Sequence, residues 1–454
     1  MSWLTLQVIA DLIDGELRGE NRMVSGVFTD TRKPDSDALF FALQGPNFNA
    51  HEVVANAPVD IAAALVVERP VDHPATQIIV DDTRLALGRL AAAWRQRFSK
   101  PVIALTGSNG KTTVKEMMWS VLRRVGNPLV TAGNLNNDIG VPLTLLRLRE
   151  EHDFAVIEMG ANHPGEIASL TEMVRPDVAL ITNAAAAHLE GFGDLEGVAS
   201  AKGEIFSGLD QSGVAVINAD DQFASFWKTL AGNRRIITFG SSEGADVFIQ
   251  DFSPPKIVVE KQNYPLNLTL YGRHNVMNAA AAMAALLAID LKVDDILQGL
   301  ENMLPVAGRL TLLQGAQGSR VIDDSYNANP TSVRAAIEVL ANEPADKRIL
   351  VLGDMAELGD AAEALHAEVG QVAKQAGIDY LFTYGALSAA AAEAFGENAL
   401  SFLEQEQLIE HLRGVLDSNT VVLVKGSRMM RMDKVAVELS QDNNAKQQEH
   451  HHAA

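Results

Sequence analysis

The chain has 454 residues, no cysteine, and 58 Asp and Glu against 37 Lys and Arg, which give a formal net charge of -21. The lack of cysteine excludes disulfides and thiolate metal sites. The acidic balance disfavours a nucleic-acid backbone as partner, because phosphate neutralisation needs a basic face. The length exceeds what one hydrophobic core supports, so we expect three domains.

The N-terminal residues lack the pattern of a secretory signal. Residues 1–10 have no cationic residue before an apolar stretch, and Asp11 and Asp14 follow at once. The longest uncharged apolar run, Ala279–Ile289, is far shorter than the roughly 20 residues that a membrane span needs. We therefore expect a cytoplasmic protein without a membrane span. The ending EHHHAA is either a purification tag or a native tail, and it carries no functional argument.

Residues 1–98 have the pattern of a small α/β domain, with β-like runs at Leu39–Leu43 and Ala62–Val67 and a helical stretch at Leu85–Phe98. A central domain, residues 99–308, begins with the apolar strand Pro101–Thr106, which leads into a glycine-rich turn and a helix. Strand, glycine turn and helix in this order are typical of phosphate-binding folds.

The rest of the central domain predicts a mainly parallel sheet with a different edge. Apolar runs alternate with helical stretches, which indicates βαβ units; these runs are Phe154–Met159, Val178–Thr182 and Val214–Ile217. Between about 235 and 271 the strand-like runs have no helices between them, so we expect an antiparallel edge or small side sheet there. Its runs are Arg235–Phe239, Lys256–Glu260 and Leu266–Tyr271. An Ala-rich helix begins near Asn275.

A third domain, residues 309–454, follows the Pro- and Gly-containing connection Pro305–Arg309. Its β-like runs alternate with helical stretches and predict a Rossmann-like, doubly wound sheet; they are Val321–Asp323, Arg348–Leu352, Tyr380–Tyr384 and Thr420–Val424. From about residue 442 we expect a disordered or tag-like tail. The whole chain is thus predicted to be an α/β protein of three domains.

The strongest local signal is Thr106-Gly-Ser-Asn-Gly-Lys-Thr-Thr113, between a strand and a helix. Glycines in such a loop turn backbone N–H groups toward phosphates, and Lys111 neutralises β- and γ-phosphate charge. The glycine spacing is shorter than G-x-x-x-x-G-K-[ST], and the alternative is a glycine-rich turn beside a lysine. We expect nucleotide contacts from Gly107, Ser108, Asn109, Gly110, Lys111, Thr112 and Thr113, with the Thr112 hydroxyl on Mg²⁺.

Two possible metal ligands follow later strands. Glu158 closes an apolar run, where a carboxylate lies well for Mg²⁺ beside a nucleotide. His188 follows the run that ends near Thr182, although a lone histidine is usually an ordinary surface or core residue. Lys202 is by default a solvated helix lysine. Three asparagines have turn formation as their default role: Asn134, Asn136 and Asn137.

Taken together, these stretches make the chain resemble the Mur ligase family over nearly its whole length. The stretches that carry the resemblance are TGSNGKTTVKE (106–116), TAGNLNNDIGVPLTLL (131–146), IEMGANHPGEI (157–167), AAAAHLEGFG (184–193), AKGEIF (201–206), GRHNVMNAAAA (272–282), VAGR (306–309), DDSYNANP (323–330), GDMAELG (353–359) and KGSR (425–428). DDSYNANP, GDMAELG and KGSR favour the member that adds a D-alanyl-D-alanine dipeptide to a UDP-linked muramoyl tripeptide. The resemblance implies an ATP- and Mg²⁺-dependent ligase of peptidoglycan synthesis.

The resemblance also implies roles for individual residues. Asn275 and Asn278 would contact the adenine region, Arg309 the phosphates and Asp324 the ribose. Lys202 corresponds to a lysine that is carbamylated in several family members, and as a carbamate it would bind a second Mg²⁺. The implied catalytic set is Lys111, Glu158, His188, Lys202 and Arg309, and the implied metal ligands are Thr112, Glu158, His188 and carbamylated Lys202.

The first domain resembles the family's UDP-binding portion through Thr29, Asp30, Thr31, Arg32 and His51. The chain has Asn49 where family members often have Asp, which leaves the details of that contact open, and the alternative is that these residues only shape a loop. Further substrate contacts are assigned to Asn134, Asn136, Asn137, Tyr326, Asn329, Lys425, Ser427 and Arg428.

The implied reaction activates the tripeptide's terminal carboxylate with the γ-phosphate of ATP, and the dipeptide amine then attacks the acyl phosphate. We expect a monomer whose domains close about residues 305–309. The alternatives are a sister ligase that adds the third amino acid, a folylpolyglutamate synthase, a P-loop kinase or regulatory ATPase, and a nucleotide-binding scaffold. Whether the third peptide residue is meso-diaminopimelate or lysine stays open.

Overall fold

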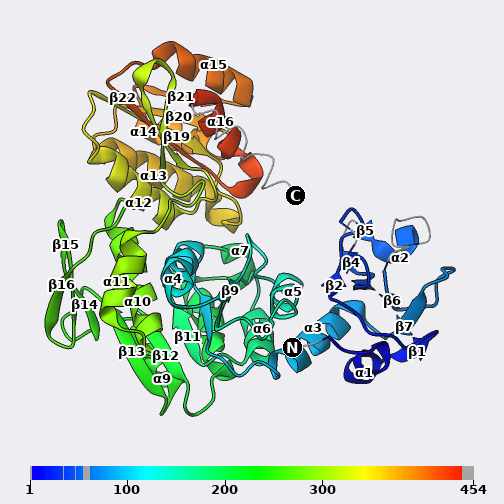
Figure 1. The fold of residues 1–454 in the computed structure, drawn as a ribbon. Coiled ribbons are helices and arrows are strands. Elements are labelled where there is room, and N and C mark those ends of the chain that lie inside the picture. The colour runs from blue at the N-terminus through cyan, green and yellow to red at the C-terminus, as the bar shows by residue number, and fades with distance from the viewer. Residues whose placement is uncertain (1–2, 34, 46–47, 55–61, 442–454) are drawn as a thin grey trace.

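The computed structural model describes residues 3–33, 35–45, 48–54 and 62–441. The tail predicted from about 442 lies outside these residues. Three large sheets form in chain order, each with helices packed against it (Figure 1). The predicted three-domain α/β fold is confirmed, while the boundaries at 98/99 and 308/309 stay predictions.

The first sheet has the strand order β1-β7-β6-β3-β2 and is parallel except for β1. Its strands are β1 (Glu16–Arg18), β2 (Val27–Phe28), β3 (Leu39–Phe41), β6 (Ala64–Val67) and β7 (Thr76–Ile79), and β4 (Gln44–Gly45) pairs with β5 (Phe48–Asn49) beside it. The helices are α1 (Leu6–Leu12), α2 (Ala50–Val53) and α3 (Thr83–Arg95). Asp82 caps α3 by accepting the backbone N–H groups of Arg84 and Leu85, which fixes where this helix begins.

The central sheet runs β16-β15-β14-β13-β12-β11-β8-β10-β9, and it is parallel from β14 to β9. The strands are β8 (Val102–Thr106), β9 (Pro128–Val130), β10 (Phe154–Glu158), β11 (Val178–Ile181), β12 (Val214–Asn218), β13 (Arg235–Gly240), β14 (Val247–Phe252), β15 (Pro255–Val259) and β16 (Gln262–Pro265). The helices are α4 (Lys111–Val125), α5 (Gly140–Leu145), α6 (Glu166–Val174), α7 (Leu189–Phe192), α8 (Leu195–Gly203), η2 (Glu204–Gly208), α9 (Ala224–Ala231), α10 (Arg273–Leu287) and α11 (Val293–Glu301).

The antiparallel edge predicted for this sheet exists, but two of its members differ from the prediction. β15 pairs antiparallel with β14 and β16, whereas β13 pairs parallel with β12. Helix α9 precedes β13 and provides the crossover that a parallel pair needs. Residues 266–271 form no strand; Leu266 and Leu270 instead bury their side chains in the core under α10.

The third sheet runs β17-β18-β22-β19-β20-β21, with only the β17–β18 pair antiparallel. Its strands are β17 (Thr311–Gln314), β18 (Arg320–Asp324), β19 (Lys347–Gly353), β20 (Tyr380–Tyr384), β21 (Ala399–Phe402) and β22 (Thr420–Lys425). The helices are η3 (Ala316–Gly318), α12 (Pro330–Ala341), η4 (Gly359–Ala361), α13 (Ala362–Gln375), α14 (Ala389–Phe395), α15 (Gln405–Val415), η5 (Arg428–Met430) and α16 (Met432–Leu439). Separate apolar clusters on its two faces give the doubly wound arrangement that the sequence predicts.

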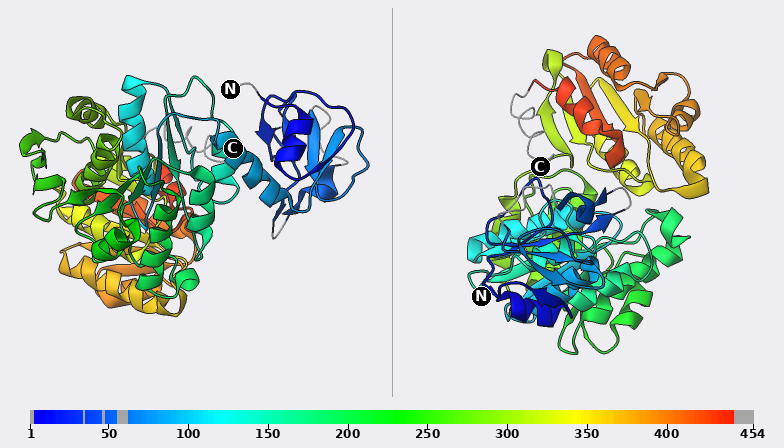
Figure 2. Two further views of the ribbon diagram at one scale, coloured as in Figure 1. Left: turned by 90° about the horizontal axis from the view of Figure 1, so that it is seen from below. Right: turned by 90° about the vertical axis from the view of Figure 1, so that its right-hand side faces the viewer.

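The first and central domains share one hydrophobic core across α3, which joins them in Figures 1 and 2. Trp3 and Trp94 stack with ring centroids 4.5 Å apart, and the Arg149 guanidinium lies over both rings. Arg95, at the end of α3, donates to the carbonyl oxygens of Val174 and Arg175 at 2.8 and 3.0 Å. The hydrogen bonds of the buried Arg95 side chain and the stacked Trp3 and Trp94 rings hold these two domains in a fixed relative position.

Candidate active site

The glycine-rich turn leaves the carboxyl end of β8 and leads into α4, as the sequence predicts. Gly107 has φ +146°, and a Cβ there would lie 1.9 Å from the Thr182 hydroxyl oxygen. Gly110 has φ +83°, and a Cβ there would lie 2.3 Å from the Asn278 amide oxygen. Both positions therefore need glycine for conformation and for space. The alternative of an ordinary turn does not account for a loop packed this closely between two other segments.

The loop is also tied to the end of β11. The Ser108 and Asn109 backbone N–H groups donate to Asn183, the former to its carbonyl oxygen and the latter to its side-chain oxygen, at 2.9 and 3.0 Å. The Thr182 hydroxyl donates to the Asn109 carbonyl oxygen at 2.6 Å. These bonds fix the loop backbone before any ligand arrives. Thr182 and Asn183 were not predicted as site residues, because their contact with the loop depends on strand order.

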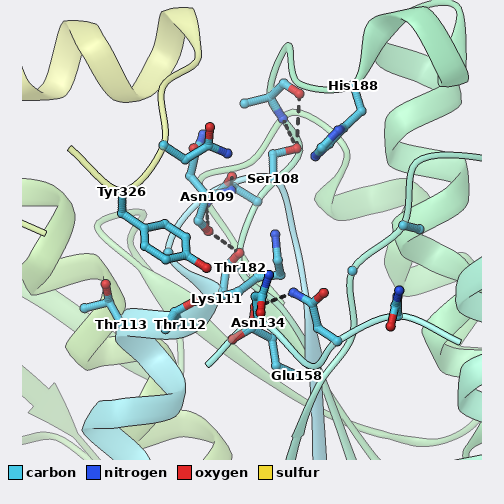
Figure 3. A pocket seen from close by; sticks show the side chains of 18 of the residues that line it. Ser108, Asn109, Lys111, Thr112, Thr113, Asn134, Glu158, Thr182, His188 and Tyr326 are labelled. Atoms are coloured by element: carbon cyan, nitrogen blue, oxygen red, sulfur yellow. Dashed lines mark hydrogen bonds between the residues drawn. The ribbon is translucent and has the colours of Figure 1, made fainter. Parts of the chain in front are cut away.

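Lys111 is the first residue of α4 and bends back toward its own loop (Figure 3). Its amine donates to the Gly107 carbonyl oxygen at 2.6 Å. Burial lowers the pKa of this amine, Glu158 opposes that shift and Arg309 adds to it. The site therefore holds a cation whose charge is poorly compensated by its protein neighbours, which favours an anionic ligand beside it.

Glu158, labelled in Figure 3, ends β10 and is buried. Its Oε1 accepts the Asn136 side-chain amide at 2.9 Å, while Oε2 is buried and has no hydrogen-bond partner among the described residues. A buried carboxylate oxygen without a partner is costly unless it meets a cation. The predicted metal role of Glu158 thus fits the geometry, and Asn136 holds the carboxylate in place.

Lys202 lies in α8 and is 1% exposed, so the default reading of a solvated helix lysine is wrong. Its amine lies 5.1 Å from the centroid of the Phe192 ring. Burial, and next the nearby Lys111, lower the pKa of Lys202 to about 7. Near pH 7 this amine is therefore neutral in a large fraction of the molecules. The neutral amine is the form that reacts with CO₂.

His188 directly precedes α7 and has a left-handed backbone, φ +55°, and its ring lies at the border of the C-terminal domain. Its Nδ1 pairs with the Glu357 carboxylate, which comes from the loop after β19. This pairing lowers the pKa of Glu357. The ring's Nε2 is the nitrogen left for another ligand. Glu357 was part of a resemblance stretch but was not predicted as a site residue.

A second contact between domains lies at the glycine loop itself. Asn329 caps α12 and donates from its side-chain amide to the Asn109 side-chain oxygen at 2.7 Å. Nearby, the Arg309 guanidinium lies 4.3 Å from the centroid of the Tyr326 ring, and Arg428 lies 5.5 Å from it. Two cations and an aromatic ring from the C-terminal side thus face the loop.

Lys425 and Asp324 form a buried pair at the carboxyl ends of β22 and β18. The Lys425 amine donates to the Asp324 carboxylate at 2.6 Å and to the Asn327 carbonyl oxygen at 2.9 Å. Lys425 therefore supports the loop that carries Asn327 and Tyr326. His274 is a further residue that the sequence did not single out: burial lowers its pKa, against the effect of nearby Asp324.

Most of the predicted site residues line one cavity of about 1400 Å³. They are Ser108, Asn109, Gly110, Lys111, Thr112, Thr113, Asn134, Asn136, Asn137, Glu158, His188, Asn275, Asn278, Arg309, Asp324, Tyr326, Asn329, Lys425 and Arg428. The cavity also reaches α3 of the first domain through Arg84 and Arg89. Gly107 and Ser427 adjoin lining residues in sequence, but they and Lys202 are not part of the described lining.

The predicted UDP-binding residues lie elsewhere, within the first domain, and are not part of this described cavity lining. Arg32 donates to the Asp30 carboxylate at 2.9 and 2.8 Å, which lowers the pKa of Asp30 to about 2. The His51 Nε2 accepts the Glu68 backbone N–H at 2.9 Å, and its Nδ1 lies 3.0 Å from the Asn49 side-chain oxygen. These contacts are local, as expected if the residues only shape their loops, and UDP binding stays a prediction. Thr29 and Thr31 lie in the same stretch as Asp30.

Two known protein families match most of the chain. The family described as "Mur ligase middle domain" matches residues 105–286, and that described as "Mur ligase, glutamate ligase domain" matches residues 308–428. The chain belongs to the Mur ligase family. An Escherichia coli (strain K12) relative named UDP-N-acetylmuramoyl-tripeptide--D-alanyl-D-alanine ligase is 46% identical, over 97% of this chain and 99% of the relative.

Solved structures agree with this placement. The Acinetobacter baumannii MurF crystal structure I superposes with a TM-score of 0.90 at 36% identity, covering 97% of this chain and 100% of that one. The Thermotoga maritima MurF ligase in complex with ADP gives a TM-score of 0.81 at 25% identity, covering 94% and 98%. The resemblance seen in the sequence is confirmed.

Proposed function

We propose that this chain is an ATP-dependent ligase that joins D-alanyl-D-alanine to UDP-N-acetylmuramoyl-tripeptide, giving the pentapeptide, ADP and phosphate in peptidoglycan synthesis. Two relatives named UDP-N-acetylmuramoyl-tripeptide--D-alanyl-D-alanine ligase are 46% and 42% identical over 97% and 95% of this chain. The single structural observation that carries the proposal is the glycine loop with Lys111 in a cavity lined by all three domains. One cavity can bring a nucleotide and two peptide substrates together.

The residues of the site supply charge and position rather than a nucleophile. Lys111 and Arg309 neutralise the charge that spreads over the transferring phosphoryl group, and the N–H groups of the loop that do not donate to Asn183 hold the phosphates. The carboxylate of the tripeptide is the attacking group in the first step, and the dipeptide amine in the second, with an acyl phosphate between them. In the nucleotide's other half, Asn275 and Asn278 contact the adenine region and Asp324 the ribose.

Mg²⁺ fits the donor set beside the loop. Glu158 offers a buried carboxylate oxygen without a protein partner, Thr112 a hydroxyl and His188 its Nε2. No group of three or more His, Asp or Glu in the described part of the chain is close enough to hold a metal alone. Nucleotide phosphates and water would complete the coordination, as is usual for Mg²⁺. When bound, the ion would neutralise phosphate charge, and Glu158 and His188 would hold it.

Carbamylation of Lys202 is part of the proposal, because a buried amine with a pKa of about 7 is ready to react with CO₂. The product is a carbamate, with release of a proton, and its carboxylate would help to hold a second Mg²⁺. Intact-mass measurement in CO₂-equilibrated buffer tests it: the active enzyme should carry the added group, which a Lys202→Ala variant lacks. Active, CO₂-equilibrated enzyme with a free amine would exclude it.

The first domain is proposed to hold the UDP group through Thr29, Asp30, Thr31, Arg32 and His51. The cavity reaches α3 of this domain, which is the direction that a UDP-linked peptide must follow to the glycine loop. Eight further residues are proposed to contact or position the peptides: Asn134, Asn136, Asn137, Tyr326, Asn329, Lys425, Ser427 and Arg428. The proposed form is a cytoplasmic monomer; no helix in the described ranges is long and apolar enough for a bilayer.

Phosphate release with each substrate omitted in turn tests the proposed function. We expect release only when ATP, UDP-muramoyl tripeptide and D-alanyl-D-alanine are all present, together with ADP in equal amount. Release without the tripeptide would favour a P-loop kinase or regulatory ATPase instead. Turnover with a single amino acid in place of the dipeptide, or with a folate, would favour the sister ligase or the folylpolyglutamate synthase. Lysine- and diaminopimelate-containing tripeptides compared in the same assay decide the third residue.

A further inference from the structure

The contact between His188 and Glu357 joins two domains at the metal-binding side of the site. His188 lies at the start of α7, on the side of the central domain that faces the C-terminal domain (Figure 1). Glu357 lies in the loop between β19 and η4. The ring's Nδ1 meets the carboxylate's Oε2. Figure 3 shows the His188 side chain at the edge of the cavity that holds Lys111 and Glu158.

The loop that carries Glu357 is firmly held by its own domain. The Met355 backbone N–H donates to the His366 Nε2 at 2.9 Å, and the Asp354 carboxylate accepts the Ser388 backbone N–H at 2.7 Å. Met355 and Leu358, on either side, are buried in the core of the C-terminal domain. Glu357 itself is exposed toward the central domain, so the loop presents this one carboxylate to His188.

The backbone at both ends of the contact adopts a conformation that non-glycine residues rarely take. His188 has φ +55° and Glu357 has φ +62°. Such residues persist where surrounding structure fixes them, and they gather at functional sites. A half-exposed ion pair stabilises a protein little, so stability alone does not account for two left-handed residues that meet each other.

The chemistry of imidazole gives the contact a consequence. A carboxylate at Nδ1 accepts the proton of that nitrogen and thereby selects the tautomer in which Nε2 has a free lone pair. The same pairing fixes the orientation of the ring. Carboxylate–histidine pairs of this kind are the usual outer support of metal-binding histidines, and their loss weakens metal affinity by about 10–100-fold.

We propose that Glu357 is a positioning residue for His188: a carboxylate from the C-terminal domain that orients the metal-binding nitrogen of the central domain when the two domains meet. The inference rests on the proposed role of His188 in the ligase reaction. It makes formation of the complete metal site depend on the arrangement of the domains. A nucleotide–metal complex would therefore bind tightly only where the C-terminal domain is in place.

Metal binding without turnover tests this inference. Mn²⁺ serves as the probe, titrated into the full-length chain with a non-hydrolysable ATP analogue and followed by electron paramagnetic resonance. We expect Glu357→Ala to weaken Mn²⁺ binding on the order of 10-fold, and Glu357→Gln to give an intermediate effect because its amide oxygen still accepts from Nδ1. Asp360→Ala is the matched control, since it removes an exposed acidic residue from η4, directly after the same loop. It should bind Mn²⁺ as the wild type does.

A double-mutant cycle with His188→Ala separates positioning from general damage. In the His188→Ala background, Glu357→Ala should cause no further loss of Mn²⁺ affinity. An equal loss in both backgrounds, or unchanged affinity in Glu357→Ala alone, would overturn the inference. This test can fail or succeed independently of the proposed function. If Glu357→Ala weakens Mn²⁺ binding but the wild-type enzyme releases no phosphate with the peptide substrates, the ligase reaction is contradicted. The positioning role of Glu357 then still holds.

Discussion

Lys111 shows how one side chain can be favourable for function and unfavourable for stability. Its amine is buried, its pKa is lowered, and it donates a hydrogen bond to the Gly107 carbonyl oxygen. An incoming polyphosphate removes this cost by supplying opposite charge where the protein supplies little. The energy is therefore spent on binding anionic ligands rather than on holding the fold.

We expect Lys111→Ala to lower the rate of ADP formation by at least about 10²-fold, comparable with loss of one transition-state donor in other enzymes. Its thermal midpoint should equal or exceed that of the wild type, because a poorly compensated buried charge is removed. Steady-state assays and thermal unfolding measure the two effects. Lys228→Ala, at an exposed lysine of α9, is the control and should keep full activity. Wild-type turnover in Lys111→Ala would contradict the whole assignment of the loop.

Asp323 gives a prediction for stability against pH. Burial chiefly raises the pKa of its carboxyl to about 6, with Asp324 and Asp433 adding to the shift and Ser325 opposing it. The folded state thus holds this proton at pH values where the unfolded chain, in which the carboxyl has its ordinary pKa of 3.8, has lost it. Stability from this group is present at low pH and is lost as the pH rises from about 4 to 6.

Asp323→Asn should remove that loss, since the amide oxygen still accepts the Ser325 backbone N–H, a 3.1 Å bond in the wild type. The variant's gain in thermal midpoint over the wild type is expected to grow between about pH 4 and 6.5 and to level off above pH 7. Differential scanning calorimetry at several pH values measures it. A gain that is the same at every pH would show that Asp323 does not titrate in this range.

At the scale of elements, the site could be predicted from the sequence where chemistry is local. The glycine loop, Lys111 and Thr112 lie within one strand-turn-helix unit, and Glu158 ends a single strand. Thr182, Asn183 and Glu357 were missed because they reach the site from segments far away in the chain. Strand order and domain packing decide such contacts, and neither has a local signal.

The same distinction explains the errors in the antiparallel edge. β13 was expected in the antiparallel edge because no helical stretch follows it in the sequence. Helix α9 precedes it, however, and allows it to pair parallel with β12. Residues 266–271 have an alternating apolar pattern that suits a strand, and two leucines of this stretch are buried beneath α10 without strand pairing. Burial of alternate residues predicts an apolar face but not the backbone that presents it.

Helix α12 gives a prediction that separates fold from function at one residue. Asn329 caps the helix, where its side chain accepts the Ser332 backbone N–H at 2.9 Å, and its amide also reaches Asn109 at 2.7 Å. Asn329→Ser should keep the helix cap but lose the hydrogen bond to Asn109. Asn329→Ala should lose both the cap and this hydrogen bond, and the protein should lose about 1 kcal/mol of stability.

Nucleotide binding should weaken equally in the two variants, while only Asn329→Ala should lower the thermal midpoint. Calorimetric titration with ADP and thermal unfolding provide the measurements. Binding that follows the midpoint, with Asn329→Ser indistinguishable from wild type, would mean that the contact with Asn109 has no part in holding the loop.

In the whole molecule, the two domain borders differ in kind. The first and central domains share a hydrophobic core, with Trp94 stacked on Trp3 and Arg95 bonded to carbonyl oxygens at the end of α6. The described contacts of the C-terminal domain with the site are instead polar: His188 with Glu357 and Asn109 with Asn329. Polar contacts of this kind separate easily. We therefore expect the C-terminal domain to move during the catalytic cycle.

The lack of cysteine allows a direct test of that motion. A Cβ placed on Gly359 would lie 4.0 Å from the Cα of Glu190, across the same border, which suits a disulfide between Glu190→Cys and Gly359→Cys. Both positions are exposed, so each single substitution should leave turnover nearly unchanged, although Gly359→Cys should lower the thermal midpoint because Gly359 has φ +58°.

We expect the oxidised double variant to lose at least about 10-fold in turnover, because substrates and products must pass a border that can no longer open. Reduction should restore the rate, and the two single variants under the same oxidant are the controls. If the cross-linked enzyme turned over at the wild-type rate, the peptides would have to enter with the C-terminal domain in place. His188 and Glu357 would then stay paired throughout the cycle, and the metal site would be complete before any substrate arrived.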